Sequence, residues 1–235
     1  MRGRMAGMTT AQGARERARN EVTAAIKEEA RRQLAAEGAA KLSLRAVARE
    51  LGMVSSALYR YFPSRDELLT ALIIDAYDAL GAAAEKARDA AGGAAPVDCF
   101  IAVCEAVRTW ALAHPHEYAL IYGSPVPGYA APETTVPAAA RTGMVLIGIF
   151  RDARQGLGLD ELPLSAELRP EAARLAAEIA PDLPPEVAAA MVAAWAQLFG
   201  LVSFELFGQF NNVIEDRERF FRHAVTGLAR GAGLR

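Results

Sequence analysis

The stretch "SLRAVARELGMVSSALYRYFPSRDEL", Ser43 to Leu68, decides how this chain is expected to fold. Its first half places leucine, valine and alanine at the i, i+3, i+4 and i+7 positions of one helix face, behind a serine that can cap the helix. Gly52 follows the end of that helix, and Pro63 ends a shorter helix that begins at about Ser55. Two short helices joined by a tight turn form a helix-turn-helix.

The second helix of this motif has two different faces. Leu58 and Phe62 are four residues apart, so both can face the first helix. The remaining residues then point outward, small at the front of the helix and aromatic or cationic behind. In a helix-turn-helix the second helix enters the major groove of DNA, where hydroxyl and methyl groups can meet base edges. We therefore expect Ser55, Ser56 and Ala57 to read the DNA sequence.

Basic and aromatic side chains flank this reading surface. Tyr59, Arg60 and Tyr61 can reach phosphates, which hold a protein in register on DNA. Arg65 makes a second phosphate site with the N–H groups at the start of the next helix, and the start of the first motif helix makes another, where Arg45 could also reach a guanine. The expected DNA-binding residues are Ser43, Arg45, Val54, Ser55, Ser56, Ala57, Tyr59, Arg60, Tyr61 and Arg65.

The net charge of −2 conceals a division along the chain. Residues 1–65 carry 13 Lys and Arg against 6 Asp and Glu, a net charge of +7, whereas residues 66–235 carry 13 against 22, a net charge of −9. A basic N-terminal part joined to an acidic remainder indicates a local surface that binds an anion. A solvated, arginine-rich helix is the alternative explanation of this charge.

The remainder of the chain indicates an all-α protein. Alanine is abundant, and valine, isoleucine and threonine form no alternating runs. We expect a disordered tail over 1–14, a helix-turn-helix DNA-binding domain over 15–65 whose first helix is 15–37, and a larger helical domain for ligand binding and dimerisation over 66–235. Further helices are expected over 64–90, 100–111, 116–122, 138–155, 171–180, 185–208 and 217–231.

The almost uncharged segment that begins near Val187 predicts a dimer, because a helix that is apolar on all sides must be covered on all sides. Its larger side chains, among them Trp195, suit the core of their own chain, and its small ones form a seam where another helix can approach closely. A two-fold partner would cover this seam and would place two recognition helices on a palindromic site. The expected dimer interface is Ala189, Ala193, Ala196, Gly200, Phe220, Phe221, Val225 and Leu228.

Other functional classes compete with DNA binding, since two short helices also occur in ordinary bundles. Residues 187–204 carry no charge and could span a bilayer, although Gln197 and Ser203 interrupt them and no aromatic belt or basic flank follows. Two further classes are a helical-bundle enzyme and a helical interaction protein without DNA binding. The sequence shows no catalytic constellation, phosphate loop or dinucleotide fingerprint, and no metal or cofactor is expected. Turnover without retention on DNA would favour the enzyme.

Residues Ser43 to Ile73, SLRAVARELGMVSSALYRYFPSRDELLTALI, resemble the signature of the tetracycline-repressor (TetR) family of bacterial transcriptional regulators. With the first helix, the resemblance covers about residues 15–75. It implies a cytoplasmic, ligand-responsive repressor that binds a palindromic operator in double-stranded DNA as a homodimer. Arg65 stands where the family usually has lysine, and the turn Met53–Ala57 lacks the common Lys-Gly pair, so base preference does not transfer.

Two later stretches, HPHEYALIYG from His114 and WAQLFGLVSFEL from Trp195, resemble a subgroup named for a Trp/His/Gly motif. Phe199 replaces the histidine of that subgroup, so the role of the histidine does not carry over. The family resemblance also implies an inducer pocket inside the C-terminal bundle, apolar and aromatic and so suited to a small lipophilic or aromatic ligand. The expected ligand-binding residues are Tyr77, Trp110, Tyr118, Tyr122, Met144, Trp195 and Phe199.

Overall fold

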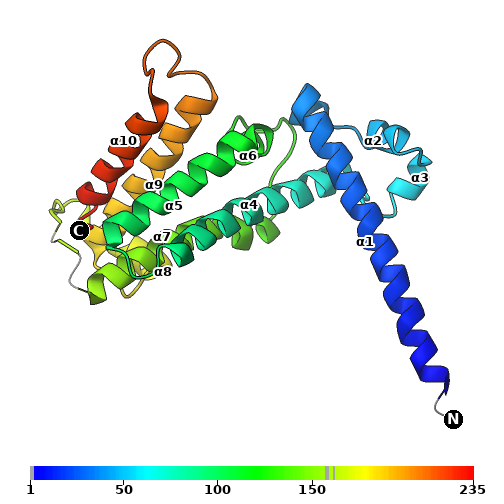
Figure 1. The fold of residues 1–235 in the computed structure, drawn as a ribbon, viewed down its shortest axis with the longest axis horizontal. Coiled ribbons are helices and arrows are strands. Elements are labelled where there is room, and N and C mark those ends of the chain that lie inside the picture. Colours follow the sequence, from blue (N-terminus) through cyan, green and yellow to red (C-terminus); the bar gives the residue numbers. More distant parts are fainter. Residues whose placement is uncertain (1–2, 157–158, 161) are drawn as a thin grey trace. The chain divides into compact units, whose positions relative to one another are not determined.

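A computed structural model describes residues 3–156, 159–160 and 162–235 of the chain (Figure 1). The predicted all-α class is confirmed: these residues form α-helices and two short 3₁₀ helices, η1 and η2, and contain no strand. The elements are α1 Gly3–Glu37, η1 Ala39–Lys41, α2 Leu44–Glu50, α3 Ser55–Leu58, α4 Arg65–Ala90, α5 Pro96–Ala113, α6 Pro115–Tyr122, η2 Glu133–Thr135, α7 Val136–Gln155, α8 Arg169–Ile179, α9 Pro185–Leu206 and α10 Arg217–Gly231.

The described chain divides into two compact units. Unit 1 contains the residues up to Ile73 together with Ser124–Pro132, and unit 2 contains Ile74–Gly123 and Glu133–Arg235. Helix α4 therefore begins in unit 1 and continues in unit 2. The segment Ser124–Pro132 belongs to unit 1 although the helices on either side of it, α6 and α7, belong to unit 2.

Unit 1 is built on α1, against which α2 packs (Figure 1). The buried face of α1 carries Ile26, Ala30 and Leu34, whose spacing of four residues places them on one side of a helix. The helix ends before Gly38, whose φ of +80° lies in the left-handed region that favours glycine. Its start differs from our expectation: α1 begins at Gly3, so the backbone of residues 3–14, expected as a disordered tail, is helical.

Local signals set both ends of the helix-turn-helix. Ser43 caps α2 by accepting a hydrogen bond from the N–H of Ala46 at 3.4 Å. After α2 the chain turns at Gly52, with φ of +64°, and the N–H of Met53 bonds back to the carbonyl of Ala48 at 2.8 Å. This is the hydrogen bond of a glycine-terminated helix end, and it brings α3 against α2.

Helix α3 is shorter than predicted. The α-helical part ends at Leu58, and the expected continuation to Phe62 is a series of turns. In these turns Arg60 and Tyr61 bond to carbonyls three residues back, at 3.3 and 2.8 Å, as in a tightened helix end. Pro63 prevents the helix from continuing beyond these turns, because a proline disfavours the helical conformation in the residue before it.

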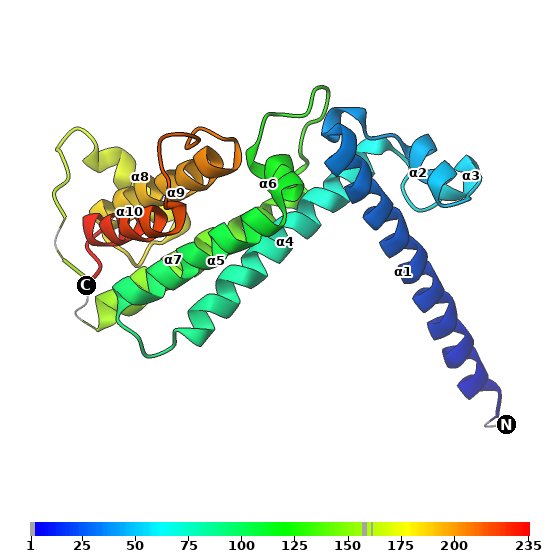
Figure 2. The same ribbon diagram turned by 45° about the horizontal axis from the view of Figure 1, so that its top comes forward.

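The core of unit 2 is centred on α5, which packs against α7, α9 and α10 (Figures 1 and 2). Its apolar side contains Phe100, Val103, Cys104 and Val107, all fully buried. Ion pairs join α7 to α4: Arg141 donates to Asp78 and Glu85, each at 2.6 Å. Buried residues of α9 and α10, the two helices predicted to form a dimer, also belong to this core.

Helix α9 is long and apolar enough to cross a membrane by length and composition alone, which is weak evidence for a span. It packs instead on α8, α5 and α10, with Met191, Leu198 and Val202 buried in the core of unit 2. The carboxylate of Glu205 is also buried in it, paired with Arg108 of α5 through two hydrogen bonds of 2.7 Å. These contacts identify α9 as a core helix of a folded bundle.

Candidate nucleic-acid interface

The outward face of α3 has the composition that the sequence predicts. Leu58 is 1% exposed and Phe62 is 7% exposed, so both side chains face into unit 1. Ser55, Ser56 and Arg60 are exposed, and Tyr59 is 42% exposed. The motif therefore presents two hydroxyls, an aromatic ring and a guanidinium to solvent, which are groups able to bind base edges and phosphates.

Residues around α3 extend this face. Val54, just before the helix, is 70% exposed, whereas Ala57 and Tyr61 are half-buried. At the start of α2, Arg45 is exposed, while the hydroxyl of Ser43 is already used to cap the helix. The Ser43 hydroxyl therefore has a structural role in addition to its expected contact with DNA.

Arg19 of α1 is a cation next to this face that the sequence analysis missed. Its guanidinium carbon lies 5.7 Å from the centre of the Tyr61 ring, in the geometry of a cation–π contact. The two residues lie far apart in sequence, and no local pattern connects them. The basic surface of unit 1 thus includes part of α1 as well as the helix-turn-helix.

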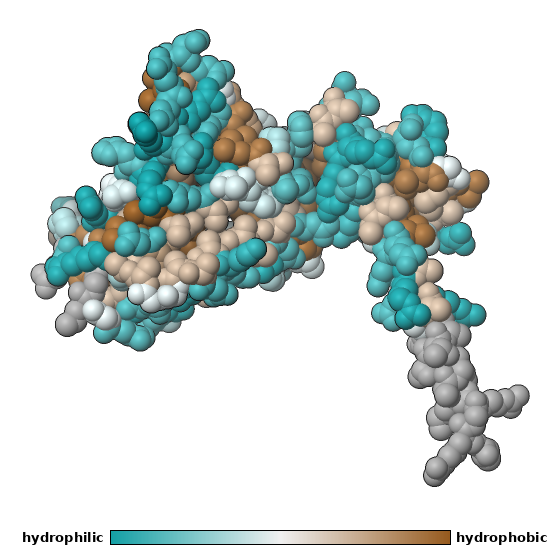
Figure 3. Space-filling model, viewed as in Figure 1, coloured by the Kyte–Doolittle hydropathy of each residue, from teal (hydrophilic) through white to brown (hydrophobic). Residues whose placement is uncertain are grey.

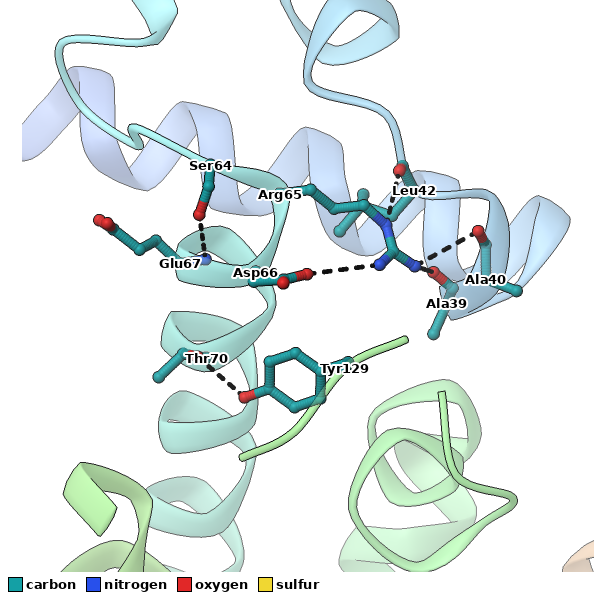
Figure 4. A network of polar contacts seen from close by, with 9 residues as sticks. All are labelled: Ala39, Ala40, Leu42, Ser64, Arg65, Asp66, Glu67, Thr70 and Tyr129. Atoms are coloured by element: carbon teal, nitrogen blue, oxygen red, sulfur yellow. Dashed lines mark hydrogen bonds and ion pairs between the residues drawn. The ribbon is translucent and has the colours of Figure 1, made fainter. Parts of the chain in front are cut away.

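Arg65 lies in different surroundings from those we expected (Figure 4). Its Nε donates to the carbonyl of Leu42 at 3.2 Å, and one terminal nitrogen donates to the carbonyls of Ala39 and Ala40 at 2.8 and 3.3 Å. The other terminal nitrogen is 3.5 Å from the carboxylate of Asp66. The guanidinium expected to bind phosphate therefore binds carbonyl oxygens of its own chain.

Helix α4 begins beside this cluster (Figure 4). Ser64 caps it, because its hydroxyl accepts a hydrogen bond from the N–H of Glu67 at 3.1 Å. One turn further on, the hydroxyls of Thr70 and Tyr129 share a hydrogen bond of 2.8 Å. Tyr129 comes from the distant segment Ser124–Pro132, and sequence reasoning gave no sign that this loop contributes to unit 1.

Most residues expected to bind a ligand gather in one aromatic cluster of unit 2. The rings of Tyr122 and Phe199 stack with their centres 4.0 Å apart. Tyr77 and Tyr118 contact Tyr122 at 6.0 and 5.3 Å, and Trp195 contacts Phe199 at 5.7 Å. Trp110 is not part of these contacts and packs instead against His114, 5.2 Å between ring centres.

Burial raises the pKa values of the tyrosines Tyr118 and Tyr122 of this cluster. The Tyr118 hydroxyl donates to the carbonyl of Phe199 at 3.0 Å and shares a 2.9 Å hydrogen bond with Ser203. Desolvation raises the pKa of Tyr118 to about 12, although the hydrogen bond with Ser203 acts in the opposite direction. Desolvation also raises the pKa of Tyr122, and the neighbouring phenols Tyr77 and Tyr118 add to the increase. These phenols therefore stay neutral at physiological pH.

A cavity of about 550 Å³ lies between α7, α8 and α9 of unit 2. Its lining is apolar apart from Glu178, and it includes Met144, Ile147, Met191 and Trp195. Met144 and Trp195, two of the expected ligand-binding residues, both line this cavity and are 48% and 40% exposed. Trp195, expected to fill the core of its own chain, instead connects this cavity with the aromatic cluster.

The residues expected in a dimer interface fall into two groups. Ala193 and Ala196 are exposed, and the rest of the first group is half-buried: Ala189, Gly200, Phe220 and Leu228. The second group, Phe221 and Val225, is only 3% and 0% exposed, so the structure places it in the core of unit 2 instead of at the surface. The reason is that α10 packs against α5 and α9, and Arg108 of α5 lies 5.4 Å from the centre of the Phe221 ring.

Comparisons with known proteins agree on one family. The family model described as bacterial regulatory proteins of the tetR family matches residues 26–72, and the one described as the tetracyclin repressor-like C-terminal domain matches residues 100–228. A curated relative, the HTH-type transcriptional regulator Rv1816 of Mycobacterium tuberculosis, is 42% identical over 84% of this chain and 86% of its own.

Solved structures show the same fold. The crystal structure of the regulatory protein SCO4313 is 36% identical, covers 91% of this chain and 97% of its own, and superposes with a TM-score of 0.74. The structure of RolR in complex with resorcinol is 14% identical, covers 92% and 94% of the two chains, and has a TM-score of 0.53. At that identity, RolR shares the fold alone.

Proposed function

Because this chain belongs to the TetR family and is a helix-turn-helix transcriptional regulator, we propose that it is a repressor that binds a palindromic operator as a homodimer and is released by a small ligand. The observation that supports DNA reading is the face of α3. Leu58 and Phe62 fix the motif from inside, and Ser55, Ser56 and Arg60 are left exposed. We place its action in the cytoplasm, where a regulator meets DNA.

In this proposal the contacts with DNA are of two kinds, to base edges and to phosphates. Ser55, Ser56 and Ala57 face base edges in the major groove, because short side chains let the helix backbone come close to the bases. Tyr59 and Arg60, with Arg45 at the start of α2, bind phosphates on either side. The +7 charge of residues 1–65 attracts the DNA, whereas the groove-facing residues choose the sequence.

The homodimer rests on the surfaces of α9 and α10 that unit 2 leaves uncovered. The small side chains Ala193 and Ala196 are exposed on α9, and Phe204 near its end is 53% exposed. Figure 3 shows hydrophobic residues at the surface near the end of α9. Phe220 contacts Phe210, which in turn contacts Phe204, at 5.5 and 5.7 Å between ring centres. A second copy would cover this apolar region by two-fold symmetry.

The ligand proposal rests on the cavity of unit 2 and on the aromatic cluster that Trp195 joins to it. An apolar lining with a single carboxylate favours a small lipophilic or aromatic compound over a sugar or nucleotide. RolR was crystallised with resorcinol, an aromatic compound, which illustrates such binding in a protein of the same fold. A ligand releases DNA only if it binds the two conformations with unequal affinity.

The experiment that tests DNA reading starts by selecting an operator from random duplexes with the wild-type protein. Binding to that operator should weaken steeply as salt increases, because phosphate contacts release counterions. Ser55→Ala and Ser56→Ala should change the preferred bases, at a cost of about 1–3 kcal/mol for each lost base contact. Failure to enrich any sequence, with the protein folded, would contradict the proposal and would favour an interaction protein or an enzyme.

A further inference from the structure

We infer that Arg65 is a positioning residue, which sets the helix-turn-helix from within unit 1 instead of binding a DNA phosphate. This inference rests on the proposed DNA-binding function. It is carried by the four acceptors around the guanidinium: the carbonyls of Ala39, Ala40 and Leu42, and the Asp66 carboxylate (Figure 4). Arg65 directs donors from all three of its nitrogen atoms toward its own chain.

The acceptors show what the side chain holds in place. Ala39–Lys41 form the short helix η1, and Leu42 completes the connection from α1 to α2. The carbonyl of Ala39 also accepts a hydrogen bond from the N–H of Leu42 at 3.3 Å, and this bond is part of the 3₁₀ turn. The guanidinium therefore binds the connection in its 3₁₀ conformation. Leu42 directly precedes Ser43, the cap of α2, and its position therefore determines where α2 begins.

The hydrogen bond between Arg65 and Leu42 also joins the two ends of the helix-turn-helix segment. Leu42 lies just before Ser43 and Arg65 just after Ser64, so these two residues stand at the two ends of the segment that contains α2 and α3. Joining the ends of a segment restricts the conformations that it can adopt. The direction of the exposed residues on α3 is therefore tied, through this bond, to the start of α4.

Arginine and lysine differ in their ability to do this. A guanidinium is a planar fork of five N–H donors and can bond several separated carbonyls at once, whereas an ammonium is a compact charge on a flexible stem. A phosphate contact, in contrast, can be supplied by either residue. Lysine at this position should therefore preserve a phosphate contact but not the three carbonyl bonds seen here.

The test compares Arg65→Lys, Arg65→Gln and Arg60→Gln on the selected operator and on a scrambled duplex, at several salt concentrations. Arg65→Gln and Arg60→Gln each lose one positive charge, so the two variants have the same net charge. We expect both Arg65 variants to bind the operator on the order of tenfold to a hundredfold more weakly, from the loss of hydrogen bonds to a charged group. Their discrimination against scrambled DNA should fall, with an unchanged salt slope.

Arg60→Gln is the control for a phosphate ligand. It should weaken operator and scrambled DNA alike and should reduce the salt slope by about one. The inference is overturned if Arg65→Gln behaves in that way, or if Arg65→Lys retains wild-type affinity and discrimination. Thermal unfolding confirms that each variant is folded during the measurement. If Arg65→Gln is not folded, the affinity and discrimination of Arg65→Lys alone decide whether Arg65 acts through the carbonyl bonds. A wild-type protein that binds no DNA would contradict the proposed function instead.

Discussion

At the scale of single residues, Tyr118 shows how a partner changes the role of a side chain. Its ring is fully buried, and its hydroxyl bonds to the carbonyl of Phe199 and to Ser203. A phenol held in this way aligns α6 with α9, the helices that carry the stacked rings of Tyr122 and Phe199. Ligand contact by Tyr118 stays a prediction, whereas its hydrogen bonds within unit 2 are part of the fold.

Tyr118 predicts a dependence of stability on high pH. The unfolded chain loses the phenolic proton near pH 10, while in the folded chain the pKa of Tyr118 is about 12. Between these values the folded state binds more protons, so the free energy of unfolding should fall as pH rises. Tyr118→Phe should reduce this fall in urea titrations across that pH range.

The same substitution has a cost near neutral pH. Phenylalanine keeps the ring but leaves the carbonyl of Phe199 without the donor from Tyr118. That carbonyl keeps its partner within α9, the N–H of Ser203, so the cost is that of the lost hydrogen bonds of the hydroxyl, about 0.5–1.5 kcal/mol each. A Tyr118→Phe protein as stable as the wild type at neutral pH, with the same decline toward pH 12, would contradict the account given for this residue.

At the scale of elements, the segment Ser124–Pro132 has an unexpected position. The sequence predicts a Pro/Gly loop at 123–137, and nothing in it indicates which helices it contacts. The structure assigns Ser124–Pro132 to unit 1, where Tyr129 bonds to Thr70 on α4. Gly123 joins Tyr122 to this loop, so the chain runs from the aromatic cluster of unit 2 into the unit that contains the helix-turn-helix.

A double-mutant cycle measures the strength of this attachment. Tyr129→Phe and Thr70→Val each remove one hydroxyl, and each should lower the free energy of unfolding by about 0.5–1.5 kcal/mol. Because both act on one hydrogen bond, the double variant should cost less than the sum of the two single variants. Additive effects in chemical denaturation would show that the two hydroxyls do not support each other in solution.

At the scale of the whole molecule, α9 has two sides of different character. Met191, Leu198 and Val202 are buried in unit 2, so one side of α9 completes the core of its own chain. Ala193 and Ala196 on another side are exposed and small, which allows a second helix to approach closely. In the proposed homodimer this side contacts the two-fold partner, and the contact places two copies of α3 on one operator.

Ala193→Arg should separate the dimer. A large charged side chain at a close helix contact is not accommodated, but an exposed position leaves the protomer folded. Sedimentation should show monomers at micromolar concentration, and operator affinity should collapse although no DNA-facing residue has changed. Ala82→Arg, at an exposed alanine of α4, is the matched control and should stay dimeric. A monomeric wild type, or a dimeric Ala193→Arg variant, would contradict the interface assignment.

The sequence by itself determined the local elements and the family. Caps and breakers such as Ser43, Gly52, Pro63 and Ser64 act on neighbouring residues, so their effects can be predicted without knowledge of the rest of the chain. Helical periodicity similarly showed that Leu58 and Phe62 face inward. The signature from Ser43 to Ile73 combined these features, and the comparisons confirmed the family that it indicated.

The tertiary structure alone decided which distant groups meet. Arg65 bonds to a carbonyl 26 residues away, and Tyr129 bonds to a hydroxyl 59 residues away. On α10 the adjacent residues Phe220 and Phe221 looked alike in the sequence, but packing against α5 buried one and left the other half-exposed. Periodicity gives the faces of a helix but not the element that each face contacts, because that choice depends on how all the helices fill the core together.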